Sequence, residues 1–127
     1  MNTEEFLELF ILELEQNRNL RNYYRLVNSG TSFHFRKAYL HQRLAYVGRQ
    51  VTKAGAAVWD IGCGYATTAL CLTLQGHKVT GTTLEYYYDN IRERMDWWSR
   101  YGDLSALKID YQDLFDTRHP NYIGDVG

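Results

Sequence analysis

Apolar residues recur at helical spacing in the first part of the chain. Phe6, Phe10 and Leu14 are four residues apart, which predicts an amphipathic helix capped at its start by Thr3. The opposite face of this helix is predicted to be polar and to carry Glu8, Glu13 and Glu15. The following stretch, residues 18–32, is polar and is broken by the turn signal Asn-Ser-Gly, so no helix is predicted there.

A second helix is predicted from about Phe35 to Lys53. Its buried face carries Leu40, Leu44, Val47 and Val51, and a glycine follows at the position of a C-terminal cap. The two helices make up a predicted N-terminal helical cap over residues 1–55. They could cover a substrate as a lid or simply pack on the rest of the fold, and the second interpretation is favoured.

Strand and helix patterns alternate from residue 56 onward. Three short runs, apolar or rich in β-branched residues, are typical of strands, and two helical patterns separate them. The predicted elements are a strand at 56–61, a helix at 66–75, a strand at 77–83, a helix at 86–101 and a strand at 105–110. Because helices connect the strands, the strands should be parallel, with right-handed crossovers. The sequence therefore predicts an α/β fold with a Rossmann-like parallel sheet and flanking helices over residues 56–127.

Composition and charge exclude several classes of function. The net charge of -1 leaves no electrostatic footprint for nucleic acid or an anionic membrane. Cys63 and Cys71 lack metal-ligand, redox or disulfide spacing, and the histidines are scattered, so no metal site is expected. The acidic N-terminus and the lack of a membrane-length apolar run predict a cytoplasmic protein without membrane partners.

The loop after the first strand carries the candidate chemistry. Gly62 and Gly64 let the backbone turn sharply and approach a ligand, and the next helix offers unpaired N–H groups to an anion. Asp60 stands just ahead of these glycines. Two cofactors compete for such a loop, a dinucleotide and S-adenosylmethionine. A dinucleotide fingerprint needs a third glycine where this chain has Thr67.

The loop, with the sequence Val-Trp-Asp-Ile-Gly-Cys-Gly-Tyr-Ala, resembles motif I of class I S-adenosylmethionine-dependent methyltransferases. The resemblance implies that the backbone of Gly62, Cys63 and Gly64 faces the methionine part of the cofactor. It also implies that Asp60 lies near the cofactor's amino group. Ala66 replaces the third glycine of the motif, a departure of one methyl group that need not abolish binding.

Two later segments extend the resemblance. Thr83 occupies the place of the family's usual ribose-binding acid, as in the cyclopropane-fatty-acid-synthase branch, and Glu85 follows two positions later. The resemblance implies that Glu85 holds the ribose hydroxyls with Thr83 assisting, although an acid there is also typical of a helix start. After the third strand it implies that the Asp110 side chain lies near the adenine amino group. The Tyr111 main chain would lie alongside, with Asp113 as the alternative acid.

The resemblance covers about residues 56–116 and implies a methyltransferase whose methyl acceptor is unknown. S-adenosylmethionine or S-adenosylhomocysteine is the expected ligand, and no residue is identified as a catalytic base. Tyr23, Tyr24 and His34 precede the first strand, and a structural role is favoured for each. The alternative is a non-catalytic, truncated S-adenosylmethionine-binding module. A dinucleotide-binding oxidoreductase domain is the third interpretation.

A complete class I domain has a seven-stranded sheet in the order 3-2-1-4-5-7-6, and this chain supplies its first three strands. Residues after 115 contain no predicted strand or helix, so the acceptor site over strands 4 and 5 is expected to be largely missing. Strand 1 would also keep an unpaired edge, which favours pairing with another chain. We therefore expect the chain to form homo-oligomers, to exchange elements between copies or to be part of a longer protein.

Overall fold

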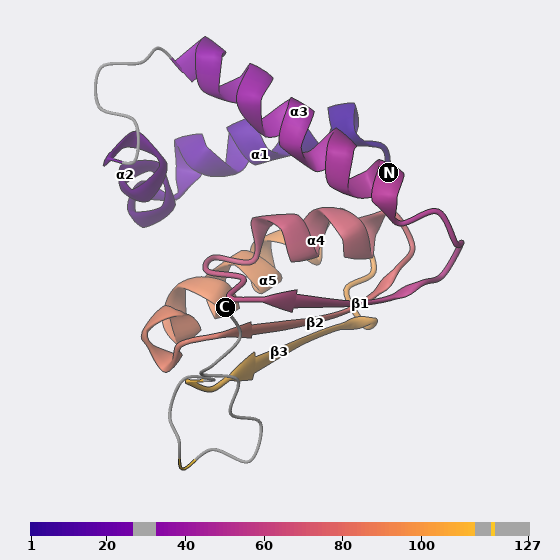
Figure 1. Ribbon diagram of the computed structural model, residues 1–127. Helices are drawn as coiled ribbons and strands as arrows, with labels where there is room; N and C mark the ends of the chain where they lie inside the picture. Colours follow the sequence, from indigo (N-terminus) through magenta and orange to yellow (C-terminus); the bar gives the residue numbers. More distant parts are fainter. Residues whose placement is uncertain (27–32, 114–117, 119–127) are drawn as a thin grey trace.

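The computed structural model describes residues 1–26, 33–113 and 118, and it describes side chains for residues 1–24, 39–113 and 118 (Figure 1). The tail after residue 115 therefore lies outside the described residues, apart from position 118. In chain order the elements are α1 (Thr3–Gln16), α2 (Arg18–Leu26), α3 (Phe33–Gln50), β1 (Ala57–Ile61), α4 (Thr67–Leu74), β2 (Lys78–Thr83), the 3-10 helix η1 (Glu85–Tyr87), α5 (Tyr88–Trp98) and β3 (Leu107–Tyr111).

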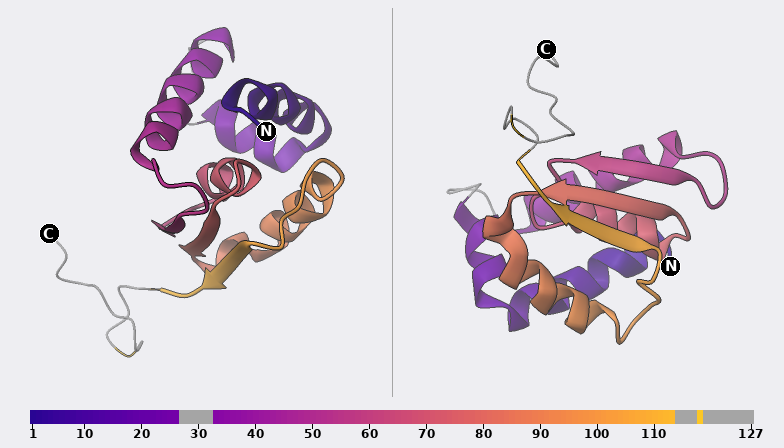
Figure 2. Two further views of the ribbon diagram at one scale, coloured as in Figure 1. Left: turned by 90° about the vertical axis from the view of Figure 1, so that its right-hand side faces the viewer. Right: turned by 90° about the horizontal axis from the view of Figure 1, so that it is seen from below.

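The strands form one parallel sheet in the order β1-β2-β3. Val58 pairs with Val79, and Val79 with Leu107, so the register continues across all three strands. Right-handed crossovers that advance in one direction place their helices, α4 and α5, on the same face of the sheet. The described helices all lie on that face in Figure 1, and the view from below in Figure 2 shows the other face without a covering helix. The predicted α/β, Rossmann-like arrangement is confirmed.

The N-terminal region contains three helices instead of the two predicted. Asn17 ends α1, and its Oδ1 accepts a hydrogen bond from the Leu20 backbone N–H at 3.1 Å, which caps the start of α2. Leu20 is 1% exposed and anchors this polar helix in the core. The prediction of no helix at 18–32 was wrong for Arg18–Leu26: Leu20, Tyr23 and Tyr24 stand at helical spacing, a short stripe that the polar composition of the segment obscured.

The start of α1 also differs from the prediction. Its cap is Asn2, whose Oδ1 accepts a hydrogen bond from the Glu5 backbone N–H at 2.9 Å. Thr3 is instead the first residue of the helix, and its Oγ1 accepts a hydrogen bond from Gln75 Nε2 at 3.2 Å. The hydroxyl predicted to cap α1 therefore connects α1 to the end of α4.

One hydrophobic core joins the N-terminal helices to the helices on the sheet. Phe6 and Phe10 of α1 are each 1% exposed, and Phe6 stacks on Trp98 of α5 with ring centroids 4.8 Å apart. Leu44 of α3 and Leu70 of α4 belong to the same buried cluster. The predicted helical cap and the predicted sheet domain therefore share side-chain packing across their boundary.

β2 passes close beneath the loop that follows β1. A Cβ atom added at Gly81 would lie 2.9 Å from Cys63 Sγ and 3.0 Å from Ile109 Cδ1. The contact with Cys63 Sγ is too short to form without movement of a neighbour, and the contact with Ile109 is tight. The missing side chain at Gly81 therefore leaves the space into which the Cys63 side chain fits.

We expect Gly81→Ala to destabilise the fold by about 1–3 kcal/mol, because the added methyl group overpacks this space. Cys63→Ala removes the sulfur atom, so part of the cost of Gly81→Ala should be recovered in the double variant. Urea unfolding of both single variants and of the double variant measures this coupling. Strictly additive costs would contradict a direct contact between the loop and Gly81.

Candidate ligand-binding site

The loop between β1 and α4 contains alternating residues in the left-handed conformation. Gly62, Gly64 and Ala66 have φ angles of 66°, 56° and 67°. Cys63 donates its backbone N–H to the Thr82 carbonyl oxygen at 2.9 Å, which holds the loop to β2. The left-handed conformation costs a non-glycine residue such as Ala66 about 1–2 kcal/mol. Ala66 is fully buried, so its surroundings hold it in this conformation.

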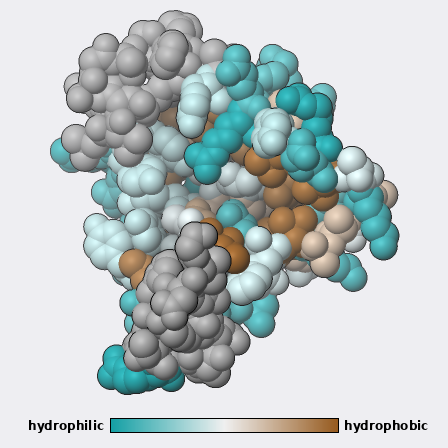
Figure 3. Space-filling view, in the orientation of Figure 1, coloured by the Kyte–Doolittle hydropathy of each residue, from teal (hydrophilic) through white to brown (hydrophobic). Residues whose placement is uncertain are grey.

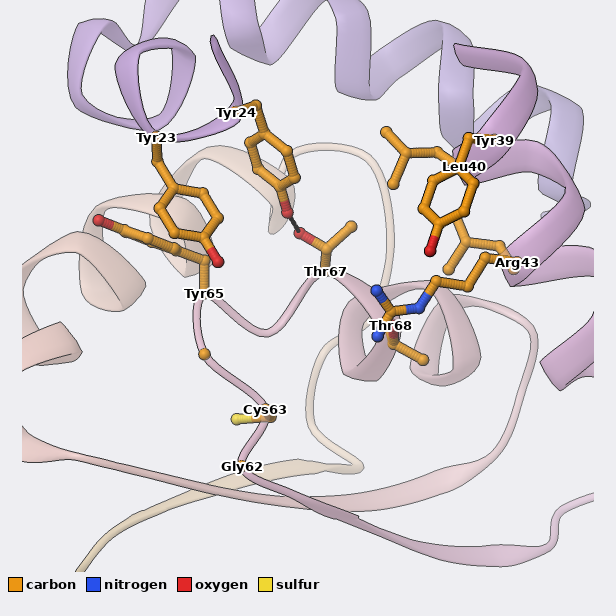
Figure 4. A pocket seen from close by; sticks show the side chains of 12 residues that line it. Tyr23, Tyr24, Tyr39, Leu40, Arg43, Gly62, Cys63, Tyr65, Thr67 and Thr68 are labelled. Carbon is orange, nitrogen blue, oxygen red and sulfur yellow. Dashed lines mark hydrogen bonds between the residues drawn. The ribbon is translucent and has the colours of Figure 1, made fainter. Parts of the chain in front are cut away.

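A first hollow, called the tyrosine hollow below, has a volume of about 220 Å³ and lies between the loop and helices α2 and α3 (Figure 4). At one end Tyr23 packs against Tyr65 with ring centroids 4.4 Å apart, and Tyr39 and Arg43 lie at the other. The lining residues are Tyr23, Tyr24, Tyr39, Leu40, Arg43, Leu44, Gly62, Cys63, Gly64, Tyr65, Thr67 and Thr68.

A second hollow, called the strand-end hollow, has a volume of about 480 Å³ and lies at the carboxyl ends of the strands. It is lined by Ile61, Gly62, Gly64, Thr82, Thr83, Leu84, Tyr87, Gln112 and Asp113. The two loop glycines line both hollows, so the two hollows meet at the loop. Ligands of open parallel α/β sheets bind at this end of the strands.

The guanidinium of Arg43 lines the tyrosine hollow, and its charge acts on the carboxylate of Asp60. Burial raises the pKa of Asp60, and the positive charge of Arg43 offsets part of that rise. Burial, and to a smaller extent the charge of Asp60, raises the pKa of the Cys63 thiol to about 12. Cys63 is therefore a neutral thiol near neutral pH and a poor nucleophile. Arg43 therefore gives the hollow a positive charge, Cys63 gives it no reactive sulfur atom, and Asp60 does not line it.

Four of the predicted site residues line the two hollows. Gly62, Cys63 and Gly64 line the tyrosine hollow, and Thr83 lines the strand-end hollow. Asp60, near the end of β1, and Ala66, buried just before α4, line neither hollow. The local motif is thus assembled as one loop.

The other three predicted site residues lie elsewhere. Glu85 begins η1 with an exposed side chain and lines neither hollow. Asp110 lines a hollow on the open face of the sheet, and its Oδ1 is 3.6 Å from Lys108 Nζ. Tyr111 packs against Tyr88, with ring centroids 5.0 Å apart. None of these three residues lines the strand-end hollow; the prediction for Tyr111 concerned its main chain, which stands between Asp110 and Gln112 at the end of β3.

Asp113, the alternative to Asp110, lines the strand-end hollow together with Gln112. The Gln112 backbone N–H donates to the Thr83 carbonyl oxygen at 2.8 Å, which holds the chain after β3 at this hollow. The sequence could reveal this acid only through its position after the third strand, a position it shares with Asp110.

The lining of the tyrosine hollow includes side chains that the sequence analysis did not assign to a site. Arg43, Tyr39 and Tyr65 were missed, and Tyr23 and Tyr24 had been interpreted as structural. Tyr65 could have been found because it lies inside the motif. Arg43 and Tyr39 had no local signal, because only the packing of α3 over the loop brings them there. The third residue interpreted as structural, His34, has its side chain outside those described.

A buried arginine connects the loop to the helices. Arg94 of α5 is 0% exposed and grips the Glu13 carboxylate with two hydrogen bonds, Nε to Oε2 at 2.8 Å and Nη2 to Oε1 at 2.7 Å. Its Nη1 donates to the Tyr65 carbonyl oxygen and to Thr67 Oγ1, each at 2.8 Å. Thr67 Oγ1 in turn hydrogen-bonds the Tyr24 hydroxyl. One cation thus links α1, α2 and α5 to the loop.

The prediction that Glu13 lies on the polar face of α1 was wrong. Glu13 is 1% exposed, whereas Glu8 and Glu15 are exposed as predicted. Its position, three residues after Phe10, is on the apolar stripe of the helix. The buried carboxylate is tolerated because Arg94 neutralises its charge and donates to both of its oxygen atoms.

We expect Arg94→Met to destabilise the fold by about 3–5 kcal/mol, because it leaves the Glu13 carboxylate buried without a counter-ion. Arg92→Met is the matched control: Arg92 is exposed on the same helix, and its replacement should change stability by no more than about 0.5 kcal/mol. Replacing both partners, by Glu13→Leu and Arg94→Met, should cost less than Arg94→Met alone. Denaturant unfolding measures all three. Equal costs for Arg94→Met and Arg92→Met would show that the pair does not hold the fold.

Within the described part of the chain, no three His, Cys, Asp or Glu side chains gather closely enough to hold a metal ion. Among the described helices, none has the length and apolar character needed to cross a bilayer. Comparison of the chain with models of protein families and with curated protein sequences found no match. The function is therefore inferred from the loop and its two hollows.

Proposed function

We propose that this chain binds S-adenosylmethionine and forms the cofactor-binding part of a class I S-adenosylmethionine-dependent methyltransferase. The observation that carries the proposal is the pair of hollows that meet at Gly62 and Gly64. S-adenosylmethionine is an amino acid joined to a nucleoside through a sulfonium. The two hollows would match these two parts. The tyrosine hollow has Arg43 in its lining and Asp60 within reach of the charge of Arg43, whereas the strand-end hollow offers polar and aromatic groups.

The tyrosine hollow suits the amino-acid end of the cofactor. Asp60 supplies a carboxylate for the ammonium group, and Arg43 supplies a guanidinium for the carboxylate. The N–H groups at the start of α4 add partial positive charge for the same carboxylate. The charge of Arg43 already acts on the Asp60 carboxylate in the free protein, so the two groups lie near each other. The ammonium and the carboxylate of one ligand would therefore each meet a group of opposite sign.

The strand-end hollow suits the nucleoside. Thr83 is 5% exposed and lines this hollow at the position of the family's ribose-binding acid. Asp113 supplies the carboxylate that Glu85 was expected to provide, and Leu84 and Tyr87 offer apolar surface for a base. We therefore assign Thr83 and Asp113 to the nucleoside in place of Glu85 and of the Asp110 side chain.

S-adenosylmethionine supplies an already activated methyl group when bound, so the protein chiefly positions donor and acceptor. The fixed loop and the tyrosines around it orient the ligand and limit the access of water. We assign no base and no methyl acceptor, and a cofactor-binding module without catalysis is the alternative. A dinucleotide is not favoured, because Thr67 stands where a glycine is needed and its hydroxyl is engaged by Arg94.

Titration calorimetry with S-adenosylhomocysteine should show binding, and NAD should show none. Asp60→Asn and Arg43→Met should each weaken binding by about tenfold or more, because each removes a charge-assisted hydrogen bond. Arg49→Met is the matched control for Arg43, since Arg49 is exposed in the last turn of the same helix and should not matter. Absence of heat with S-adenosylhomocysteine, in a chain that circular dichroism shows to be folded, would overturn the proposal.

The affinity for S-adenosylhomocysteine should fall on acidification. Burial places the pKa of Asp60 above its usual value of 3.8, and a bound ammonium group favours the ionised carboxylate. Binding is therefore strongest above the pKa of Asp60 in the free protein and weakens as the pH falls through it. Calorimetry across a pH series should show the decline beginning at a higher pH than an exposed aspartate would give. If Asp60→Asn kept the same profile, another group would be responsible.

A further inference from the structure

The hydroxyl groups of Tyr24 and Thr67 are in contact in the lining of the tyrosine hollow, and neither has yet been given a role toward a ligand. Tyr24 belongs to α2, and Thr67 is the first residue of α4. Figure 4 shows the two hydroxyls facing each other between the Tyr65 end of the hollow and the Arg43 end. Two distant parts of the chain thus bring a polar contact to the place where a ligand would lie.

This pair carries more hydroxyl hydrogens than the described protein accepts. Thr67 Oγ1 accepts a hydrogen bond from Arg94 Nη1 at 2.8 Å, so that bond uses a hydrogen of Arg94. The contact between Thr67 and Tyr24 uses one of the two hydroxyl hydrogens, whichever residue donates it. Among the described residues, neither hydroxyl has a further hydrogen-bond partner. One O–H group of the pair is therefore left to donate into the hollow.

Tyr24 is the better placed of the two residues to donate to a ligand. Thr67 is 8% exposed and its oxygen lies between Arg94 and Tyr24, whereas Tyr24 is only partly buried. A phenol is also a stronger donor than an aliphatic hydroxyl, so a charged acceptor favours the hydrogen of Tyr24. The hydrogen bonds then run in one direction from Arg94 through Thr67 and Tyr24 to the ligand, and such a chain is mutually polarised.

The surroundings of the pair favour a negatively charged acceptor. The guanidinium of Arg43 lines the same hollow and forms no salt bridge with a described carboxylate. The start of α4 adds the partial positive charge of its free N–H groups. Figure 3 shows hydrophobic surface between α3 and β1, whereas the surface toward α2 is pale or teal, as suits a charged group. A planar carboxylate can accept from a guanidinium and from a hydroxyl at the same time.

We propose that the Tyr24 hydroxyl, positioned by Thr67, donates a hydrogen bond to the carboxylate of the bound ligand and so selects ligands that carry an amino-acid carboxylate. The inference rests on the proposed function, in which this carboxylate belongs to the methionine part of S-adenosylmethionine. It gives α2 a part in ligand recognition, since Tyr24 acts on the same carboxylate as Arg43. Thr67 is a positioning residue, because it acts through Tyr24.

Titration calorimetry with two ligands tests this assignment. S-adenosylhomocysteine carries the carboxylate, and its decarboxylated analogue, S-adenosyl-3-thiopropylamine, lacks only that group. Tyr24→Phe should weaken the binding of S-adenosylhomocysteine by about tenfold, because it removes a hydrogen bond to a charged group. The same variant should leave the affinity for the analogue unchanged. A general disturbance of the hollow would weaken the binding of both ligands alike.

Further variants separate positioning from structure. Thr67→Ser keeps the hydroxyl and should keep the preference for S-adenosylhomocysteine over the analogue, whereas Thr67→Val should reduce that preference. Tyr46→Phe is the matched control, because Tyr46 is 58% exposed on α3 and lines neither hollow, so both affinities should stay unchanged. Tyr24→Phe should remain folded, because it keeps the ring that packs edge-on against Phe10 with centroids 5.1 Å apart. Circular dichroism of each variant checks the fold.

The possible failures of the inference and of the proposed function differ in their results. If Tyr24→Phe bound S-adenosylhomocysteine as tightly as the unchanged chain, or lost affinity equally for both ligands, the inference would be overturned and the proposed function would stand. A Thr67→Val variant with the full preference of Thr67→Ser would overturn the positioning role of Thr67. If the folded, unchanged chain did not bind S-adenosylhomocysteine, the proposed function would fail and the inference with it.

Discussion

The buried ion pair between Arg94 and Glu13 is the interaction on which the arrangement of helices and loop depends. Both side chains are almost fully removed from solvent, at 0% and 1% exposure. A charge this deeply buried is costly unless its partner is present in the correct geometry. Removing one partner would leave the other charge buried without its counter-ion, so the two side chains hold α1 and α5 together only as a pair.

The same arginine controls the shape of the glycine loop. After two of its N–H groups satisfy Glu13, its Nη1 is left to bind the Tyr65 carbonyl oxygen and Thr67 Oγ1. These two acceptors flank Ala66, which has a left-handed φ of 67° without the freedom of a glycine. The flanking contacts supply part of the energy that holds Ala66 there. A loop fixed in this way loses little entropy when a ligand binds, so more of the contact energy remains available for affinity.

Features encoded by neighbouring residues were predictable, and those created by distant contacts were not. The strand, the two glycines and Asp60 lie within a short stretch of sequence, and the structure places them as one loop. Glu13 and Arg94 are 81 residues apart, and each looks like an ordinary exposed charge on a helix. Only the docking of α1 on α5 brings them together, and only the packing of α3 brings Arg43 to the loop.

The placement of Asp110 was only partly predictable from the sequence. The strand itself was expected, but the face of the sheet on which Asp110 lies depends on the alternation of side chains along β3. Leu107 and Ile109 pack on the helix side of β3, so the residues between and after them, Lys108 and Asp110, belong to the open face. The third strand was correctly expected near this position, but a motif aligned by sequence does not state which face a side chain occupies. A shift of one residue in that alignment would move the acid from the open face of β3 to the helix side.

The polarity of the open face changes from one strand to the next, and this gradient bears on what can cover it. β3 contributes Lys108 and Asp110, β2 contributes Lys78 and threonines, and β1 contributes Ala57, Trp59 and Ile61. A layer of helices over the whole face would bury those charges away from water, at a cost of several kcal/mol each if they lost their partners. Covering the β1 edge removes the most apolar part from water and leaves the charges solvated. The Trp59 and Ile61 side chains are therefore the part of the open face whose removal from water costs least.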